Sequence, residues 1–279
     1  KPAAQLARQG WQIQSVTVDG AGSVDFLSFT EALASRPQLF SFMLANNETG
    51  VVQDIAAIAE LAKRNGAIMH TDAVQGLGKL PLNFSALNVH AMTISSHKIH
   101  GPQGAAALIL DKRVDIQPLL HGGGQERGLR SGTENVAAIV GFGMACELAA
   151  ASLNGYTSKT QALRDQFEQG LKALSVSIFS NNVTRIPNTS FFAANGIEGE
   201  TLVTALDRKG FAVASGSACS SDSTEPSHVL LAMGVNHDLA RSAVRVSFGA
   251  HNTAAQVTNF LHVLKNEISR LKQLTSIAA

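Results

Sequence analysis

Apolar runs of strand length alternate with helix-like segments along the first 110 residues, and this alternation limits the possible folds more than any other feature. Asp54 can cap a helix that runs to Arg64, where Asn65 and Gly66 provide an ordinary stop signal. Strands that alternate with helices predict an α/β domain built on a largely parallel sheet. The predicted strands of this region are residues 13–18, 39–45, 67–70, 92–95 and 104–110.

Polar residues follow three of these predicted strands at the points where the strands end. They are Asn46 after the first, Asp72 and Gln75 after the second, and Ser95, His97 and Lys98 at the third. Open α/β sheets bind ligands beyond the carboxyl ends of their strands. The sequence therefore predicts one site that these three strand ends share.

The pattern changes after the glycines at 122–124. We predict helices at 134–150 and 157–174, then strands near 175–179, 189–193, 212–214 and 243–248, with helices at 200–209 and 253–271. This order is typical of an α+β unit. We therefore predict two domains: a larger one over residues 1–155 and a smaller C-terminal α+β one over 156–279.

Composition and charge argue against several classes of partner. The chain has 22 Lys and Arg against 21 Asp and Glu, a net charge of +1, so nothing indicates nucleic acid or an anionic membrane. We see no apolar run of about 18 residues, so we expect no membrane span. The cysteines, Cys146 and Cys219, form neither a metal pair nor a disulfide framework, which indicates a reducing, cytoplasmic setting without a catalytic metal.

Lys98 and Asp72 carry side chains that suit one kind of cofactor chemistry. A lysine in an apolar strand-to-loop junction is unusual, and burial would favour the neutral amine that Schiff-base chemistry requires. A carboxylate at Asp72 could keep a pyridine nitrogen protonated, with Gln75 at the ring hydroxyl. Taken singly, Lys98 also fits a surface position and Asp72 a turn or helix cap. Ser95 and His97 can donate hydrogen bonds to a phosphate.

Four segments together resemble the cofactor motifs of cysteine desulfurases, in order and in spacing: 46–50 (NNETG), 70–75 (HTDAVQ), 95–98 (SSHK) and 121–135 (HGGGQERGLRSGTEN). The resemblance implies a type I fold of the pyridoxal 5′-phosphate (PLP) transferases, with the cofactor on Lys98. It also implies cofactor contacts from Asn46, Asp72, Gln75, Ser95 and His97. In the family, the threonine at the position of Thr133 reaches the cofactor of a neighbouring subunit, which implies a homodimer.

Cys219 lies in a small-residue loop, Ala214-Ser-Gly-Ser-Ala-Cys-Ser-Ser221, followed by Thr224-Glu-Pro-Ser-His-Val-Leu230. This stretch resembles the catalytic loop of the group I desulfurases, which include nitrogen-fixation and iron–sulfur housekeeping enzymes. The resemblance implies that Cys219 takes sulfur from L-cysteine as a persulfide, releases alanine, and passes sulfur to an acceptor or iron–sulfur scaffold protein. Taken alone, Cys219 could also be a loop cysteine without a function. We interpret Cys146 as a core residue.

Arg245 matches the family arginine that binds the substrate carboxylate, with Asn46 beside it; Arg241 is a second choice. Family members also carry an N-terminal phosphate-binding loop and a histidine that stacks on the cofactor, and Lys1 aligns just after that histidine. His100 is a weak replacement for it. Two other hypotheses therefore remain: a catalytically impaired or partner-binding fragment, and another PLP enzyme of the same fold, such as an aminotransferase or cysteine lyase.

Overall fold

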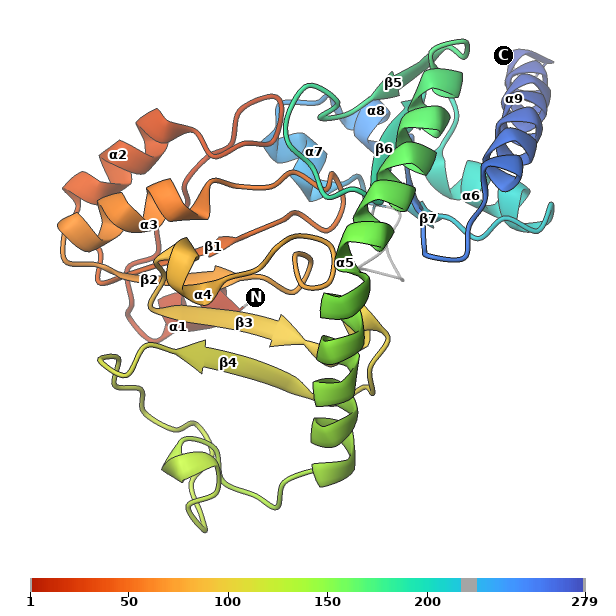
Figure 1. The fold of residues 1–279 in the computed structure, drawn as a ribbon. Coiled ribbons are helices and arrows are strands. Elements are labelled where there is room, and N and C mark those ends of the chain that lie inside the picture. Colours follow the sequence, from red (N-terminus) through yellow and green to blue (C-terminus); the bar gives the residue numbers. More distant parts are fainter. Residues whose placement is uncertain (1, 217–224, 278–279) are drawn as a thin grey trace.

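Two β-sheets organise the protein in its computed structural model, which describes residues 2–216 and 225–277 (Figure 1). The first sheet contains β1 (Leu39–Met43), β2 (Ile68–Asp72), β3 (Ala91–Ser95) and β4 (Ala106–Leu110), in that order. The first three strands are parallel, and β4 runs antiparallel to β3. The prediction of a mostly parallel sheet in an α/β fold is thus confirmed.

Helices α1 (Pro2–Arg8), α2 (Phe26–Ala34), α3 (Ile55–Arg64) and α4 (Phe84–Leu87) accompany this sheet. The carboxylate of Asp54 accepts a hydrogen bond from Ala57 N at 3.2 Å, which caps α3 as predicted. Helix α3 buries Ile55, Ile58, Ala59 and Ala62, three or four residues apart, against the sheet. Asn65 and the left-handed Gly66 end it.

The predicted strand at 13–18 is wrong. Only Val18 pairs, in a single bridge with Val24, and a tight turn at Asp19 joins the two. Ile13 is 47% exposed, so the alternating apolar residues of this segment have no sheet face to cover.

A single helix, α5 (Val136–Leu171), replaces the two helices predicted at 134–150 and 157–174. It contains no proline, and its middle is anchored by Tyr156 Oη, which donates to Phe248 O at 3.3 Å. The predicted domain boundary at residue 155 therefore falls inside a continuous helix that runs from the first sheet to the second (Figure 1). Among the described helices, α5 alone is long and apolar enough to cross a membrane by length and composition, contrary to our expectation from the sequence.

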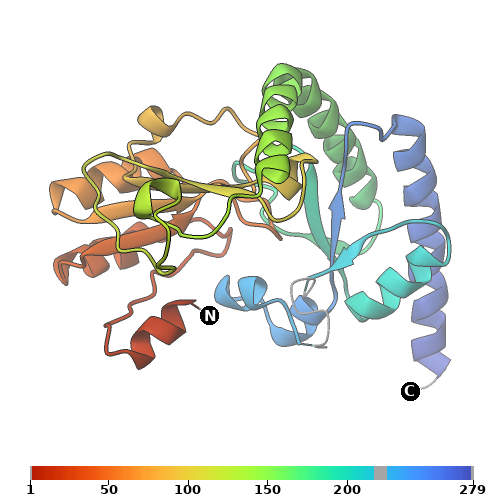
Figure 2. The ribbon, with the colours of Figure 1, turned by 90° about the horizontal axis from the view of Figure 1, so that it is seen from below.

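The second sheet has the order β5-β6-β8-β7, with every neighbouring pair antiparallel. Its strands are β5 (Val176–Ile178), β6 (Thr189–Ala194), β7 (Ala214–Ser215) and β8 (Ala243–Ser247), and its helices are α6 (Gly199–Asp207), α7 (His228–Ala232), α8 (His237–Arg241) and α9 (Ala254–Ile277). Phe167 of α5 packs against Phe192, Phe248 and Phe260 in the core of this α+β unit. Figure 2 shows α9 along the outer side of the second sheet and α5 between the two sheets.

Residues 111–135, here called the arm, connect β4 to α5 and project away from both sheets (Figure 1). The arm contains one short 3₁₀ helix, η2 (Glu126–Gly128), and Leu119 within it is 95% exposed. The backbone hydrogen bonds of Gly128, Leu129 and Ser131 are made to other arm residues. The arm therefore holds its own shape with little support from the rest of the described chain.

Candidate active site

The three polar strand ends meet at one edge of the first sheet, as predicted. Met43 pairs with Asp72 and Asp72 pairs with Thr93, so β1, β2 and β3 end side by side. The chain leaves β3 through a 3₁₀ helix, η1 (Ser96–Ile99), which carries Lys98. Parallel strands thus deliver Asp72 and Lys98 to the same edge.

Lys98 is exposed, which corrects the expectation of a buried amine. A 3₁₀ helix has three residues per turn, so Ser96 and Ile99 share its buried side and leave His97 and Lys98 on the open side. Ile99 packs in the first core, which fixes the direction of the helix. The amine is therefore presented from a rigid turn, toward the open edge of the sheet.

Asn46 shapes the loop that follows β1. Its Oδ1 accepts hydrogen bonds from the backbone amides of Glu48 and Thr49, both at 2.9 Å, and the side chain is buried. Its Nδ2 faces Met43 Sδ at 3.4 Å, a weak contact. Because the oxygen is fully used by the loop, Asn46 can reach a ligand only through its amide nitrogen.

The loop after β1 is also where the second sheet and its helices meet the strand ends. Arg245 of β8 donates from Nη1 to Asn47 O at 2.7 Å. Ser227, the N-cap of α7, donates a hydrogen bond to the carboxylate of Glu48. Arg245 therefore lies beside the loop that follows β1, although Arg245 and Asn47 are 198 residues apart in the chain.

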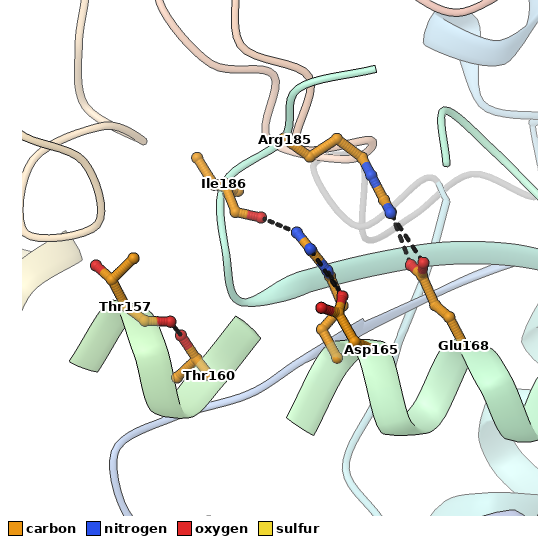
Figure 3. Close-up of polar contacts among 7 residues, drawn as sticks. Thr157, Thr160, Asp165, Glu168, Arg185 and Ile186 are labelled. Atoms are coloured by element: carbon orange, nitrogen blue, oxygen red, sulfur yellow. Dashed lines mark hydrogen bonds and ion pairs between the residues drawn. The ribbon is translucent and has the colours of Figure 1, made fainter. Parts of the chain in front are cut away.

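A second loop, residues 180–188, supports the loop that follows β1, and Figure 3 shows its Arg185 and Ile186 held by polar contacts to α5. Its Ile186 N donates to Gly50 O at 2.8 Å, and Arg164 of α5 donates to Ile186 O at 3.0 Å. Arg185 forms a two-pronged ion pair with Glu168 of α5, at 2.7 and 2.8 Å, and both side chains are almost fully buried. Removing one partner of such a pair costs about 3–5 kcal/mol, so α5 anchors the loop firmly.

Three cationic side chains, Lys79, Lys98 and Arg245, gather near the strand ends. Lys79, which follows β2, lies close enough to Lys98 and Arg245 to feel both charges. Burial, reinforced by these two cations, lowers the pKa of Lys79 to about 8. In the part of the chain that the structure describes, none of the three forms an ion pair with a carboxylate. The edge of the sheet is thus prepared for an anionic ligand.

Two other titratable groups beside the site are perturbed by burial. Burial raises the pKa of Glu48, while the Ser227 hydrogen bond and the charges of His228 and Arg245 oppose the rise. His70 bridges the strands, since its ring nitrogens lie 2.8 Å from Ser41 Oγ and 2.8 Å from Thr93 Oγ1. Burial lowers its pKa, so the neutral ring supports the sheet beneath the site.

The remaining predicted cofactor residues lie at the same edge. Ser95 Oγ and His97 Nδ1 are 2.9 Å apart. Asp72 is exposed, and its Oδ1 accepts from Val74 N at 2.9 Å, which leaves its other oxygen toward solvent. Gln75 Oε1 accepts a hydrogen bond from Lys79 Nζ at 2.8 Å.

Thr133 and Cys219 are not brought to this edge by the described chain. Thr133 is exposed at the end of the arm, just before the N-cap of α5. Cys219 lies outside the described residues. Its described flanks adjoin the site, because Ala214 pairs with Arg245 and Ser227 contacts Glu48. The role predicted for Cys219 stays a prediction.

Three other residues considered in the sequence have structural surroundings of their own. Arg241 is engaged by Glu198, the residue before α6. His100 ends η1 with a left-handed backbone, φ +66°. Cys146 packs beside the first core, as predicted, and burial raises the pKa of its thiol.

The sequence analysis did not single out three side chains that lie at or beside the site: Lys79, Glu48 and Ser227. Lys79 follows Gln75 by four residues in a glycine-rich turn, and this spacing was an available signal. Glu48 and Ser227 are 179 positions apart, so no local pattern links them.

Comparison with known proteins shows similarity to one family over most of the chain. The family model for aminotransferase class-V matches residues 1–260. The chain is 43% identical over 274 residues to a cysteine desulfurase of Cereibacter sphaeroides, covering 98% of this chain and 70% of the relative. It is 42% identical over 272 residues to one of Klebsiella pneumoniae, covering 97% and 68%. The X-ray structure of a NifS-like protein from Rickettsia africae superposes with a TM-score of 0.88 at 38% identity, over 96% of this chain and 72% of that one.

Proposed function

Because the chain belongs to the aminotransferase class-V family, we propose that it is a cysteine desulfurase that uses PLP. The observation that carries the proposal is the meeting of Lys98, Asp72 and Arg245 at one sheet edge. They come from three separate elements, and the reaction needs an amine, a carboxylate and a guanidinium together.

The residues of this edge fit PLP in their donor chemistry. The cofactor is a dianionic phosphate ester with a pyridine nitrogen and an aldehyde, and the edge offers positive charge, a carboxylate and an exposed amine. When bound, PLP supplies a ring that withdraws electrons from the α-carbon of an amino acid. Lys98 would hold it covalently, and Ser95 and His97 would contact its phosphate.

Asp72 and Gln75 would orient the ring from β2. The free oxygen of Asp72 can accept a hydrogen bond from a protonated pyridine nitrogen and keep that proton in place. The Nε2 of Gln75 can donate to the ring oxygen, because Oε1 is taken by Lys79. Asn46 Nδ2 can donate to the same ligand or to the substrate.

Arg245 is suited to hold the substrate carboxylate. Its Nη1 is fixed on Asn47 O at 2.7 Å, and its Nε has no hydrogen-bond partner among the described residues. The guanidinium thus keeps donors for the two oxygens of an α-carboxylate, in an orientation set by the loop. The amine of Lys98 would also be placed to carry a proton to and from the α-carbon of the substrate.

Cys219 would take the sulfur. In the proposed step its thiolate attacks the substrate sulfur; a sulfur–sulfur bond forms, and the sulfur–carbon bond breaks. The electron pair of the broken sulfur–carbon bond passes to the substrate β-carbon, which takes up a proton. The substrate therefore leaves as L-alanine, and its sulfur stays on Cys219 as a persulfide. This chemistry is balanced without an external oxidant or reductant.

We also propose a homodimer in which each arm serves its neighbour's site. Thr133 is exposed near the end of the arm, and the adjoining first half of α5 exposes a stripe of apolar side chains. They are Val136, Ile139, Val140, Met144 and Leu148. An exposed apolar stripe next to a self-supporting arm suits a second copy of the chain, which would bury both.

The persulfide implies a sulfur-accepting protein, such as an iron–sulfur scaffold, as the next partner. A persulfide is also readily reduced or exchanged by other thiols, so it suits a reducing compartment where acceptor thiols stay free. We propose a cytoplasmic setting on this ground.

Visible absorbance with added PLP tests the function. We expect a yellow band from cofactor bound covalently to Lys98, and its loss in Lys98→Ala. Cys219→Ser should keep the band but lose alanine formation from L-cysteine. Unchanged alanine formation by Cys219→Ser would instead support a lyase or aminotransferase. No band in the parent protein would support a fragment that binds partners without catalysis.

A further inference from the structure

Lys79 is a half-buried cation beside the site that the proposed reaction does not use. We propose that Lys79 is a positioning residue: it fixes the amide of Gln75 so that the amide nitrogen faces a ligand at the sheet edge. This inference rests on the proposed PLP site. In this proposal Lys79 acts through Gln75 and does not itself contact the ligand.

The hydrogen bond between the two side chains sets the direction of the amide. Lys79 Nζ lies 2.8 Å from Gln75 Oε1, and a lysine ammonium has donors only, so the amide oxygen must be the atom that faces it. The amide nitrogen then points the other way. It has no protein partner in the part of the chain that the structure describes.

The backbone around Lys79 is tightly held, so its amine is aimed accurately. Gly76 and Gly78 give the turn its shape: a Cβ at Gly76 would lie 2.7 Å from Leu44 Cδ2, and one at Gly78, where φ is +70°, would lie 2.8 Å from Ile99 Cγ2. Lys79 N donates to Gly76 O at 3.0 Å. Lys79 O accepts from Thr157 Oγ1 of α5 at 3.3 Å. Three elements of the fold therefore lock this turn.

The surrounding charges make the ammonium group of Lys79 costly to bury at this position. Lys79 is partly buried near Lys98 and Arg245, and no carboxylate pairs with it in the described chain. A buried cation without a counter-charge is costly. The amide oxygen of Gln75 is the polar group that offsets part of this cost, and the same bond fixes the amide.

A double-mutant cycle on PLP affinity tests the proposal. We expect Lys79→Met to weaken PLP binding about five- to tenfold, the size of one lost hydrogen bond. Gln75→Ala should weaken it at least as much. The double variant should bind PLP no more weakly than Gln75→Ala alone, since Lys79 acts only through Gln75. Lys63→Met is the matched control, because Lys63 Nζ bonds to the side chain of Asn88, 2.6 Å away, outside the site.

Two outcomes of the cycle would overturn the proposal. If Lys79→Met weakens PLP binding by the same factor with and without Gln75, then its charge acts on the ligand directly. If Lys79→Met binds PLP as tightly as the parent protein does, the amide needs no positioning.

A second measurement needs no cofactor. The side-chain amide of Gln75, assigned in a ¹H–¹⁵N spectrum by its absence in Gln75→Ala, should give one shifted pair of signals in the apo protein. In Lys79→Met these signals should move to the positions of free glutamine side chains, and in Lys63→Met they should stay. Signals that do not move in Lys79→Met would overturn the contact. A parent protein that fails to bind PLP would instead contradict the proposed function, while these signals still decide the Lys79–Gln75 contact.

Discussion

The two halves of α5 belong to one continuous helix but have different surroundings. The second half buries Thr160, Leu163, Phe167 and Leu171 against β6 and α9, and its Glu168 is paired with Arg185. The first half buries only Ala138, Phe142 and Ala145, and Val140 on its outer side is 65% exposed. The second half is thus covered by its own chain, whereas much of the apolar surface of the first half has no cover in the described chain.

The comparison shows that the neighbours of each half of α5 determine what that half contributes to the protein. In the second half, packing and an ion pair fix the loop that supports the strand ends. In the first half, the apolar stripe adds little to the stability of a single chain, because it stays in water. We therefore expect substitutions in the second half to affect folding and those in the first half to affect association.

The largest expected effect is on folding. Phe167→Ala should lower the free energy of unfolding by about 3–5 kcal/mol, because the ring is fully buried among three other phenylalanines. Leu148→Ala, in the exposed half, should change it by no more than about 0.5 kcal/mol. Urea unfolding followed by circular dichroism measures both. Equal losses would break the distinction between the halves.

A smaller effect is expected on association. Val140→Asp should weaken the proposed dimer at least tenfold, or about 1.4 kcal/mol, because it places a charge in an apolar interface. Ala162→Asp, exposed in the second half, is the matched control and should leave the dimer intact. Sedimentation velocity over a concentration series measures the difference. A dimer unaffected by Val140→Asp would assign the stripe to another partner.

The smallest effect is expected on the pH dependence of stability, at Glu48 in the loop that follows β1. Because burial raises the pKa of Glu48, the folded protein favours the protonated carboxyl, and its ionisation destabilises the fold as pH rises above 4.5. Glu48→Gln should therefore be slightly more stable than the parent at pH 7, by less than about 1 kcal/mol, and the gap should close by pH 4. Urea unfolding at several pH values measures this. If the difference in unfolding free energy between Glu48→Gln and the parent widens as the pH falls, the pKa of Glu48 is not raised by burial.

Much of the fold and of the site could be predicted because the signals are local or follow from sheet geometry. The apolar runs at 39–45, 67–70 and 92–95 became β1, β2 and β3. Once those strands were expected to be parallel, Asp72 and Lys98 had to meet at one edge.

The predictions that were wrong depend on contacts between distant parts of the chain. Asn154 and Gly155 look like a helix stop, yet Tyr156 and Thr157 bond to residues 248 and 79 and keep α5 continuous. Segment 13–18 alternates like a strand but has no neighbouring strand to pair with in the described chain. The exposure of Lys98 depends on which side of a 3₁₀ turn faces the core, and the residues of this turn do not reveal that side.

The first sheet pairs its strands in the order in which they occur along the chain. Each strand can thus dock on its predecessor as it leaves the ribosome, with a small loop-closure cost at every step. The second sheet lacks this property, because β8 must insert between β6 and β7 and therefore waits for the last part of the chain. Arg245 lies on that late strand, so the guanidinium proposed to bind the substrate joins an edge that is already formed. A half-made chain would therefore display the amine of Lys98 before Arg245 is in place.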